Sequence, residues 1–239
     1  ITGIWILFYN RHLFYVHRRD FWLFIGSGMI GMTALSVFYN ISVTKGSLAL
    51  SAVLLAMSPV FVLFLAAIFF HEPVTRHKLT CVTLALIGCV LVSGVLESNG
   101  LSWSITGILC GILASFFYAV YGIISKKVTQ KGYHFLTITF YGTLFSGMTM
   151  LPFSNIHSLS SMIVSGQRTT FFILIIPYAL YSLSMRYMEA GKASILASSE
   201  PAAAMLFGAV LYAETPGILS ICGLCFTITA VILLNYERN

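Results

Sequence analysis

Two adjacent residues, Glu200 and Pro201, could do chemistry at membrane depth, because they lie in the apolar segment 193–213, ASILASSEPAAAMLFGAVLYA. A carboxylate in a bilayer costs at least a few kcal/mol unless it faces protein or a water-filled cavity. Proline lacks the N–H that would bond the carbonyl of Ala197, so we expect a kink there. The pair predicts a pathway in which Glu200 binds a substrate amine or carries a proton. The structural alternative is a neutral Glu200 hydrogen-bonded between helices.

The pattern around Pro201 recurs around Pro59, 142 residues earlier. Each proline follows a polar residue, Ser58 or Glu200, and each is followed thirteen residues later by a glutamate. Several identities in one register indicate an internal repeat. The ungapped offset pairs Tyr39 with Tyr181, Ser42 with Ser184, Leu54 with Leu196, Ala67 with Ala209, Glu72 with Glu214 and Leu91 with Leu233.

Composition places the chain in a membrane. It is 58% hydrophobic and 8% charged, against roughly 45–50% and 25% in a soluble domain. Apolar runs of about the 20 residues that cross a bilayer occur at 21–43, 47–70, 79–96, 103–125, 134–153, 169–188, 193–213 and 217–235. The expected fold class is therefore an all-α polytopic membrane protein.

The repeat predicts how the spans are organised. Residues 1–9 are apolar but too short to cross, so we expect them to end a truncated span, with roughly forty residues missing before Ile1. The expected fold is a ten-helix bundle of two inverted five-helix repeats, here lacking the first span and part of the second. Residues 1–98 form the first repeat and residues 99–239 the second.

Loop charges predict the orientation. If residues 10–20 are cytoplasmic, alternate loops carry eleven basic residues on that side and two on the other, a strong positive-inside bias. Both ends of the full chain are then cytoplasmic. Because the basic residues are spread over short loops, the net charge of +6 indicates no nucleic-acid partner. The eleven are Arg11, Arg18, Arg19, Arg76, Lys78, Lys126, Lys127, Lys131, Arg186, Lys192 and Arg238, and the two are Lys45 and Arg168.

Several motifs predict structure rather than chemistry. The histidines lack metal-ligand spacing and no phosphate-binding loop is present, so we expect no metal, no cofactor and no enzyme. Glu72 and Glu214 stand where spans end, which favours capping roles. Small-residue stripes at Gly107, Gly111 and Ser115 and at Gly26, Gly28 and Gly31 predict close helix packing. Inert thiols are expected at Cys81, Cys89, Cys110, Cys222 and Cys225, which all fall in apolar spans.

Tyrosines and one amide are further candidates for a pathway wall. Tyr118 shares a helix face with Tyr121, and Tyr178 shares one with Tyr181. They line a cavity or belong to an interfacial aromatic belt. Asn40 is more informative, because a buried amide has four hydrogen-bonding capacities that a cavity wall can satisfy.

Two copies of one pattern resemble the EamA-type transporters of the drug/metabolite transporter superfamily. They are AVLLAMSPVFVLFLAAIFFHEP with IGCVLVSG, and ASILASSEPAAAMLFGAVLYAETP with GLCFTITAVILLN. The resemblance implies a central cavity lined by spans 47–70 and 193–213, and a bacterial plasma-membrane protein. Carried over position by position, the expected pathway residues are Ser58, Pro59, Glu200, Pro201, Tyr39, Asn40, Tyr178, Tyr181 and Tyr118.

The resemblance implies a secondary transporter, commonly an exporter, of small organic metabolites such as amino acids, amines or drugs. Alternating access about a midplane site is the leading hypothesis, with possible proton coupling through Glu200. A nucleotide-sugar or lipid-type exchanger or flippase is an alternative, although it calls for basic residues deep in the spans. A non-transporting membrane interaction protein is the other alternative.

Overall fold

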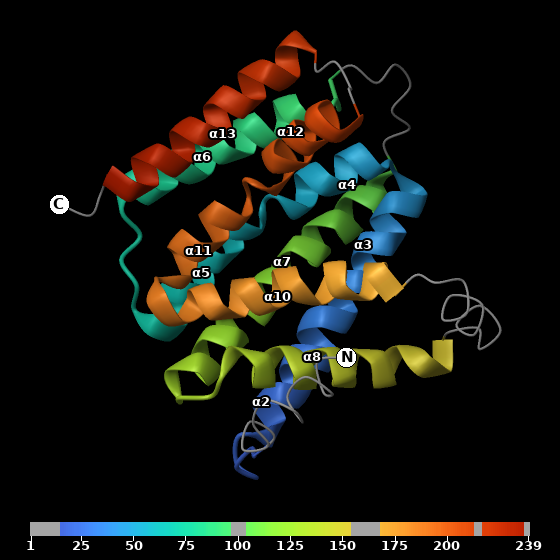
Figure 1. Cartoon of the computed structure of the whole chain (residues 1–239), viewed down its shortest axis with the longest axis vertical. Helices are drawn as coiled ribbons and strands as arrows, with labels where there is room; N and C mark the ends of the chain where they lie inside the picture. The colour runs from blue at the N-terminus through green and yellow to red at the C-terminus, as the bar shows by residue number, and fades with distance from the viewer. Residues whose placement is uncertain (1–14, 97–103, 154–167, 213–216, 237–239) are drawn as a thin grey trace. The chain divides into compact units, whose positions relative to one another are not determined.

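The computed structural model of this chain describes residues 15–96, 104–153, 168–212 and 217–236 (Figure 1). The described part is built of helices. No residue in these ranges lies in a strand. Residues 1–9, the predicted end of a truncated span, lie outside them. The helices are α2 (Phe21–Ile25), η2 (Gly26–Thr33), α3 (Ala34–Lys45), α4 (Leu48–Leu55), α5 (Ser58–Phe70), α6 (Arg76–Val92), α7 (Ile105–Gln130), α8 (Phe135–Met150), η3 (Leu151–Phe153), α10 (Arg168–Tyr187), α11 (Ala190–Ala197), α12 (Glu200–Tyr212) and α13 (Ile218–Tyr236).

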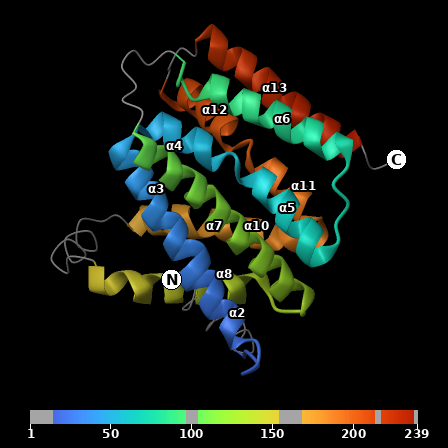
Figure 2. The same cartoon turned by 180° about the vertical axis from the view of Figure 1, so that it is seen from behind.

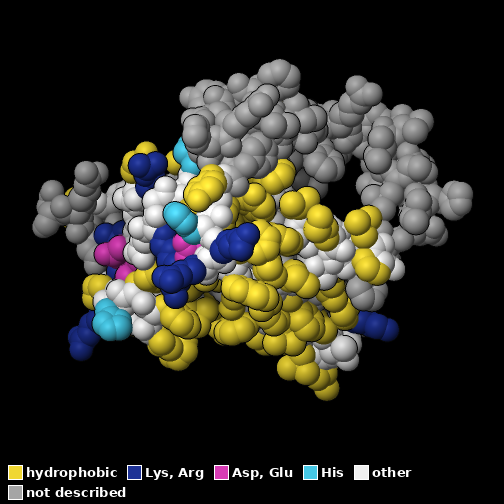
Figure 3. Space-filling view, turned by 90° about the horizontal axis from the view of Figure 1, so that it is seen from below, with side chains coloured by type: hydrophobic (Ala, Val, Ile, Leu, Met, Phe, Trp, Pro, Cys, Tyr) yellow, Lys and Arg dark blue, Asp and Glu magenta, His cyan; other side chains and the backbone are white. Residues whose placement is uncertain are grey.

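Each predicted apolar run coincides with helix, so the all-α membrane class is confirmed. Segments long and apolar enough to cross a bilayer are Phe21–Lys45, Leu48–Phe70, Ile105–Gln130, Ala190–Leu211 and Ile218–Tyr236. Large apolar side chains are exposed on them, as at Val210, which is 80% exposed. Figure 3 shows hydrophobic side chains over much of one face, with charged and histidine side chains gathered in a smaller region. A surface of this kind suits lipid rather than water.

One compact unit comprises residues 1–34 and 120–188. Within it, α2 and η2 pack on α8, and α8 packs on α10. Gly28 of η2 lies so close to α8 that an added Cβ would be 2.6 Å from the carbonyl oxygen of Gly142. The predicted close packing of this small-residue stripe is therefore confirmed. Phe24, Val128 and Ile138 form a buried hydrophobic cluster of the unit.

The other compact unit comprises residues 35–119 and 189–239. Its most extensive contact between helices is that of α6 with α13, which run side by side in Figures 1 and 2. Helix α11 packs on α5 and α6, and α12 packs on α6 and α13. The buried core of the unit comprises Leu63, Cys81, Val82, Ile195 and Leu234.

The helix bounds repeat with the offset of 142 seen in the sequence. Helices α4 and α11 each have 8 residues, α5 and α12 each have 13, and each second member starts 142 positions after the first. The start of α13 lies 142 positions after the start of α6. Each compact unit combines segments from both halves of the sequence, so the division into 1–98 and 99–239 stays a prediction about the repeat.

Two glycines allow the close approach of α6 and α13. A Cβ on Gly88 would lie 2.3 Å from Thr227 Oγ1 and 2.8 Å from the carbonyl oxygen of Gly223. Because the second atom belongs to the backbone, the helices would have to separate to admit even one methyl group.

We therefore expect Gly88→Ala to lower the free energy of unfolding by about 1–3 kcal/mol, the usual cost of overpacking. The measurement is thermal or denaturant unfolding in detergent. Gly147→Ala on α8 is the matched control, because no atom lies within 4 Å of its added Cβ. Alanine has the better helix propensity, so the control should be neutral or slightly stabilising. Equal losses for both variants would show that the α6–α13 contact is not the cause.

Candidate functional site

The two proline segments break their helices at equivalent places. Helix α4 ends at Leu55 and α5 begins at Ser58, while α11 ends at Ala197 and α12 begins at Glu200. Each proline occupies the second position of its new helix, where its missing N–H costs no intrahelical bond. The expected kink is thus a break between two half-helices. A broken helix in a membrane is tolerated where its backbone is buried in protein or lines a cavity.

The residues at the two breaks differ in exposure. Ser58 is buried, and Pro59 is among the fully buried side chains. Pro201 is half-buried, and Glu200 is exposed in the described part. Glu200 is the first residue of α12 and lies in its first turn.

Glu200 has two neighbours within electrostatic range in its own compact unit. These are the hydroxyl of Tyr39 on α3 and the thiol of Cys89 on α6. Tyr39, a predicted wall residue, is half-buried. Cys89 is buried, and the sequence carried no signal that distinguished it from the four other cysteines. A phenol and a thiol from two other helices of the unit thus feel the charge of this carboxylate.

Asn40 differs from its prediction. The side chain is exposed, not buried, and its Nδ2 donates to the carbonyl oxygen of Ser36 at 3.0 Å. This bond lies within one helical turn, so the amide satisfies part of its capacity on its own helix. The expectation of a buried amide was therefore wrong for the described part.

Tyr178 and Tyr181 belong to the unit of residues 1–34 and 120–188, where they surround Tyr121. The rings of Tyr121 and Tyr178 meet edge to face at 5.6 Å, and those of Tyr121 and Tyr181 stack at 6.3 Å. Tyr121 Oη lies 3.1 Å from Ser182 Oγ. Tyr121 and Tyr181 are buried, whereas the tyrosines of an interfacial belt keep their hydroxyl ends in water. The centre of this cluster is Tyr121. Tyr118, a predicted wall residue, is half-buried in the other unit.

An aromatic wall in the unit of Glu200 was missed from the sequence. Phe38 and Phe117 stack at 5.5 Å with an interplanar angle of 2°. Phe116 continues the row from Phe117 at 5.6 Å and meets Phe61 edge to face at 5.8 Å. All four rings are half-buried and come from α3, α5 and α7. Phenylalanines in apolar spans give no sequence signal of this kind, because their stacking depends on helix rotation.

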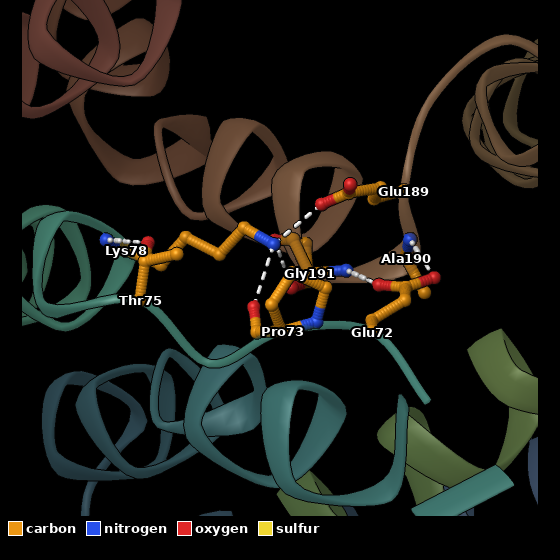
Figure 4. A network of polar contacts seen from close by, with 8 residues as sticks. Glu72, Pro73, Thr75, Lys78, Glu189, Ala190 and Gly191 are labelled. Carbon is orange, nitrogen blue, oxygen red and sulfur yellow. Dashed lines mark hydrogen bonds and ion pairs between the residues drawn. The ribbon is translucent and has the colours of Figure 1, made fainter. Parts of the chain in front are cut away.

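A network of polar contacts joins the end of α5 to the start of α11 (Figure 4). Glu72 Oε1 accepts from the N–H of Ala190 at 3.2 Å, and its Oε2 accepts from the N–H of Gly191 at 3.4 Å. The capping role predicted for Glu72 is thereby confirmed, although the helix it caps is distant in sequence. Glu214, its repeat counterpart, lies outside the described residues.

Lys78 occupies the centre of the same network. Its Nζ donates to Glu189 Oε2 at 2.5 Å and to the carbonyl oxygen of Pro73 at 2.9 Å, while its side chain is 2% exposed. A lysine this buried requires a partner. The sequence had placed Lys78 among the loop charges, and only the tertiary structure shows that it is paired inside the protein.

A second ion pair lies in the other unit, between Lys131 and Asp20. Tyr133 Oη donates to the second carboxylate oxygen of Asp20 at 2.8 Å. The hydrogen bonds from Lys131 and Tyr133 lower the pKa of Asp20 from its ordinary value of 3.8. A lowered pKa means that the contact stabilises the fold above that value and is lost as the pH falls below it. Lys131 is 42% exposed, so this pair is far more open than that of Lys78.

We expect Glu189→Gln to lower the free energy of unfolding by about 1–3 kcal/mol. Breaking a fully buried pair costs about 3–5 kcal/mol, and exposure of Glu189 reduces that cost. Lys78→Met combined with Glu189→Gln should recover most of the loss, because no unpaired charge is then buried. Unfolding of the single and double variants in detergent measures both. A double variant as unstable as the sum of its two single variants would contradict a coupled pair.

No group of three or more His, Cys, Asp or Glu residues that could hold a metal ion occurs in the described ranges.

Comparisons with known proteins give the family and the fold that this chain resembles. The profile of the EamA-like transporter family matches residues 1–94 and 105–236. An uncharacterised transporter of Archaeoglobus fulgidus is 24% identical over 220 residues, which cover 88% of this chain and 76% of that protein. A probable terminal-alkyne amino-acid exporter of Streptantibioticus cattleyicolor is 25% identical over 226 residues, covering 91% and 74%. A solved crystal structure superposes with a TM-score of 0.73 at 12% identity, covering 94% of this chain and 80% of that one.

Proposed function

Because the chain belongs to the EamA-like transporter family, we propose that it is a secondary transporter of small organic metabolites such as amino acids, amines or drugs. The chain is an integral membrane protein, and the proposed location is the bacterial plasma membrane. Transport proceeds by alternating access, in which two inverted halves expose a central site to one side and then to the other. The observation that carries the proposal is the pair of broken helices, α4–α5 and α11–α12, with bounds 142 residues apart.

The proposed direction is outward. The Streptantibioticus cattleyicolor relative is named a probable amino-acid exporter, which supports an amino-acid-like substrate and export. The proposed topology places the ends of the full chain, and the loops with eleven of the thirteen basic residues, in the cytoplasm.

Glu200 is the proposed polar anchor of the pathway. It either pairs with a substrate amine or carries the proton that couples export to the proton gradient. The stacked rings of Phe38 and Phe117 offer an apolar surface in the same unit, which suits the hydrocarbon part of a small organic molecule. Ser58, Pro59 and Pro201 complete the proposed pathway at the helix breaks, and the prolines serve as its flex points. Tyr39, Asn40, Tyr118, Tyr178 and Tyr181 remain proposed wall residues.

An exchanger of nucleotide sugars is the alternative within the superfamily. Such a substrate needs basic side chains that face the cavity to bind phosphate. Among the described residues, the buried lysines are Lys78 and Lys126, which lie near the ends of α6 and α7. Lys78 is also paired with Glu189. These placements favour the smaller, amine-bearing substrates.

We expect Glu200→Gln to abolish export if Glu200 carries the coupling proton. If Glu200 instead pairs with a substrate amine, export of amines should fall by at least about tenfold, the effect of losing one charged hydrogen bond. The measurement compares metabolites outside cells that express the full-length protein with those outside cells that express the variant. Asp20→Asn is the control, because that carboxylate lies before the first described helix. Full export by Glu200→Gln would remove Glu200 from the mechanism. No exported compound from either strain would favour import or a non-transporting interaction role.

A further inference from the structure

Helix α11 is capped by a residue from a distant part of the chain. Its first two N–H groups donate to Glu72, which lies 118 residues before Ala190. Helix α4, its counterpart at the offset of 142, is capped locally, because the hydroxyl of Ser47 accepts from Leu50 N at 3.1 Å. Glu189 stands at the position equivalent to Ser47 and has an extended N-cap backbone, yet its side chain makes no cap bond.

Because of this difference between the two repeats, the residue that caps α11 can separate from the helix that it caps. A local cap such as Ser47 moves with its own helix and stays bonded when that helix shifts. The cap supplied by Glu72 breaks when α11 moves away from the end of α5, without the unfolding of either helix. Its bonds of 3.2 and 3.4 Å lie at and beyond the long end of the usual range.

The ion pair of Lys78 reinforces the same contact from α6. Glu189 is the residue just before α11, and its partner Lys78 lies in the first turn of α6. Glu189 is 39% exposed, so water can solvate its carboxylate if the pair opens. One ion pair and two hydrogen bonds from backbone N–H groups thus hold one helix start.

We propose that Glu72, Lys78 and Glu189 are positioning residues of the transport cycle. They form a latch that holds α11 against α5 and α6, and they release it when the pathway opens on the latch side of the membrane. Helix α11 ends at Ala197, three residues before Glu200, so the latch holds the half-helix that leads to the pathway carboxylate. The latch rests on the proposed function, and by the proposed topology it lies on the cytoplasmic side.

The test is the rate at which an impermeant maleimide labels Cys89 in inside-out membrane vesicles. Cys89 suits this purpose because it is buried and lies on α6, the helix on which both α11 and α12 pack. For this test, alanine or serine replaces every other cysteine of the full-length protein, so that Cys89 alone can react. Glu72→Ala should raise the labelling rate about five- to tenfold, the population shift that loss of a helix cap allows. Glu189→Gln should also raise the labelling rate of Cys89.

Asp20→Ala is the matched control, because it breaks an ion pair of the other unit and leaves the latch intact. Its labelling rate should stay unchanged. A charge reversal, Lys78→Glu with Glu189→Lys, should return the rate toward that of the unmodified protein, whereas either reversal alone raises it. If the reversals fail to fold, Glu72→Ala and Glu72→Gln still decide the question, since a neutral side chain of equal size isolates the charge.

An unchanged rate in Glu72→Ala, or an equal rise in Asp20→Ala, would overturn the latch and leave a static cap. Export measured in the same cells separates the two proposals. A raised labelling rate without export of any compound would keep the latch as a contact that holds α11 and would reject the export proposal. Export together with a labelling rate that Glu72→Ala leaves unchanged would reject the latch and keep the transport proposal.

Discussion

The structure depends on one constraint, which is that backbone N–H and C=O groups have no water to bond in the hydrocarbon of a bilayer. Helices satisfy this constraint within each segment, and serine and threonine hydroxyls bond back to their own helices, as Ser27 does to the carbonyl of Phe24 at 2.8 Å. The few places where helical bonding lapses are therefore expensive. Two of these places are the breaks before Pro59 and Pro201, and both lie at candidate pathway residues.

The starts of helices also explain why polar side chains gather where they do. Each new half-helix exposes N–H groups that need acceptors, and a glutamate serves as an acceptor at the start of α11. The acceptor is Glu72, which reaches α11 from another segment, while Glu200 stands at the start of α12 with Tyr39 and Cys89 in electrostatic range. Structural capping and the proposed chemistry thus use the same property of helix ends.

Some site residues could be predicted because their chemistry is anomalous within a single segment. Glu200 and Pro201 are conspicuous in an apolar run, and the offset of 142 then pointed to Ser58 and Pro59. Tyr121, Cys89 and the row of phenylalanines are ordinary residues for a membrane helix. Their roles depend on which helix faces which, a rotation of α3, α6 and α7 that hydropathy does not report. The exposure of Asn40 was mispredicted for the same reason.

The sequence alone determined the helical membrane class and the approximate places of the helices, because apolar runs of spanning length have one low-energy structure in lipid. It also predicted the repeat. Tertiary structure decided the partners. It paired Lys78 with Glu189, placed Glu72 on α11 and brought Gly88 against α13. These contacts join residues more than a hundred positions apart, and their energies come from desolvation and close packing between helices. No local pattern along the chain encodes which helix supplies the other half of such a contact.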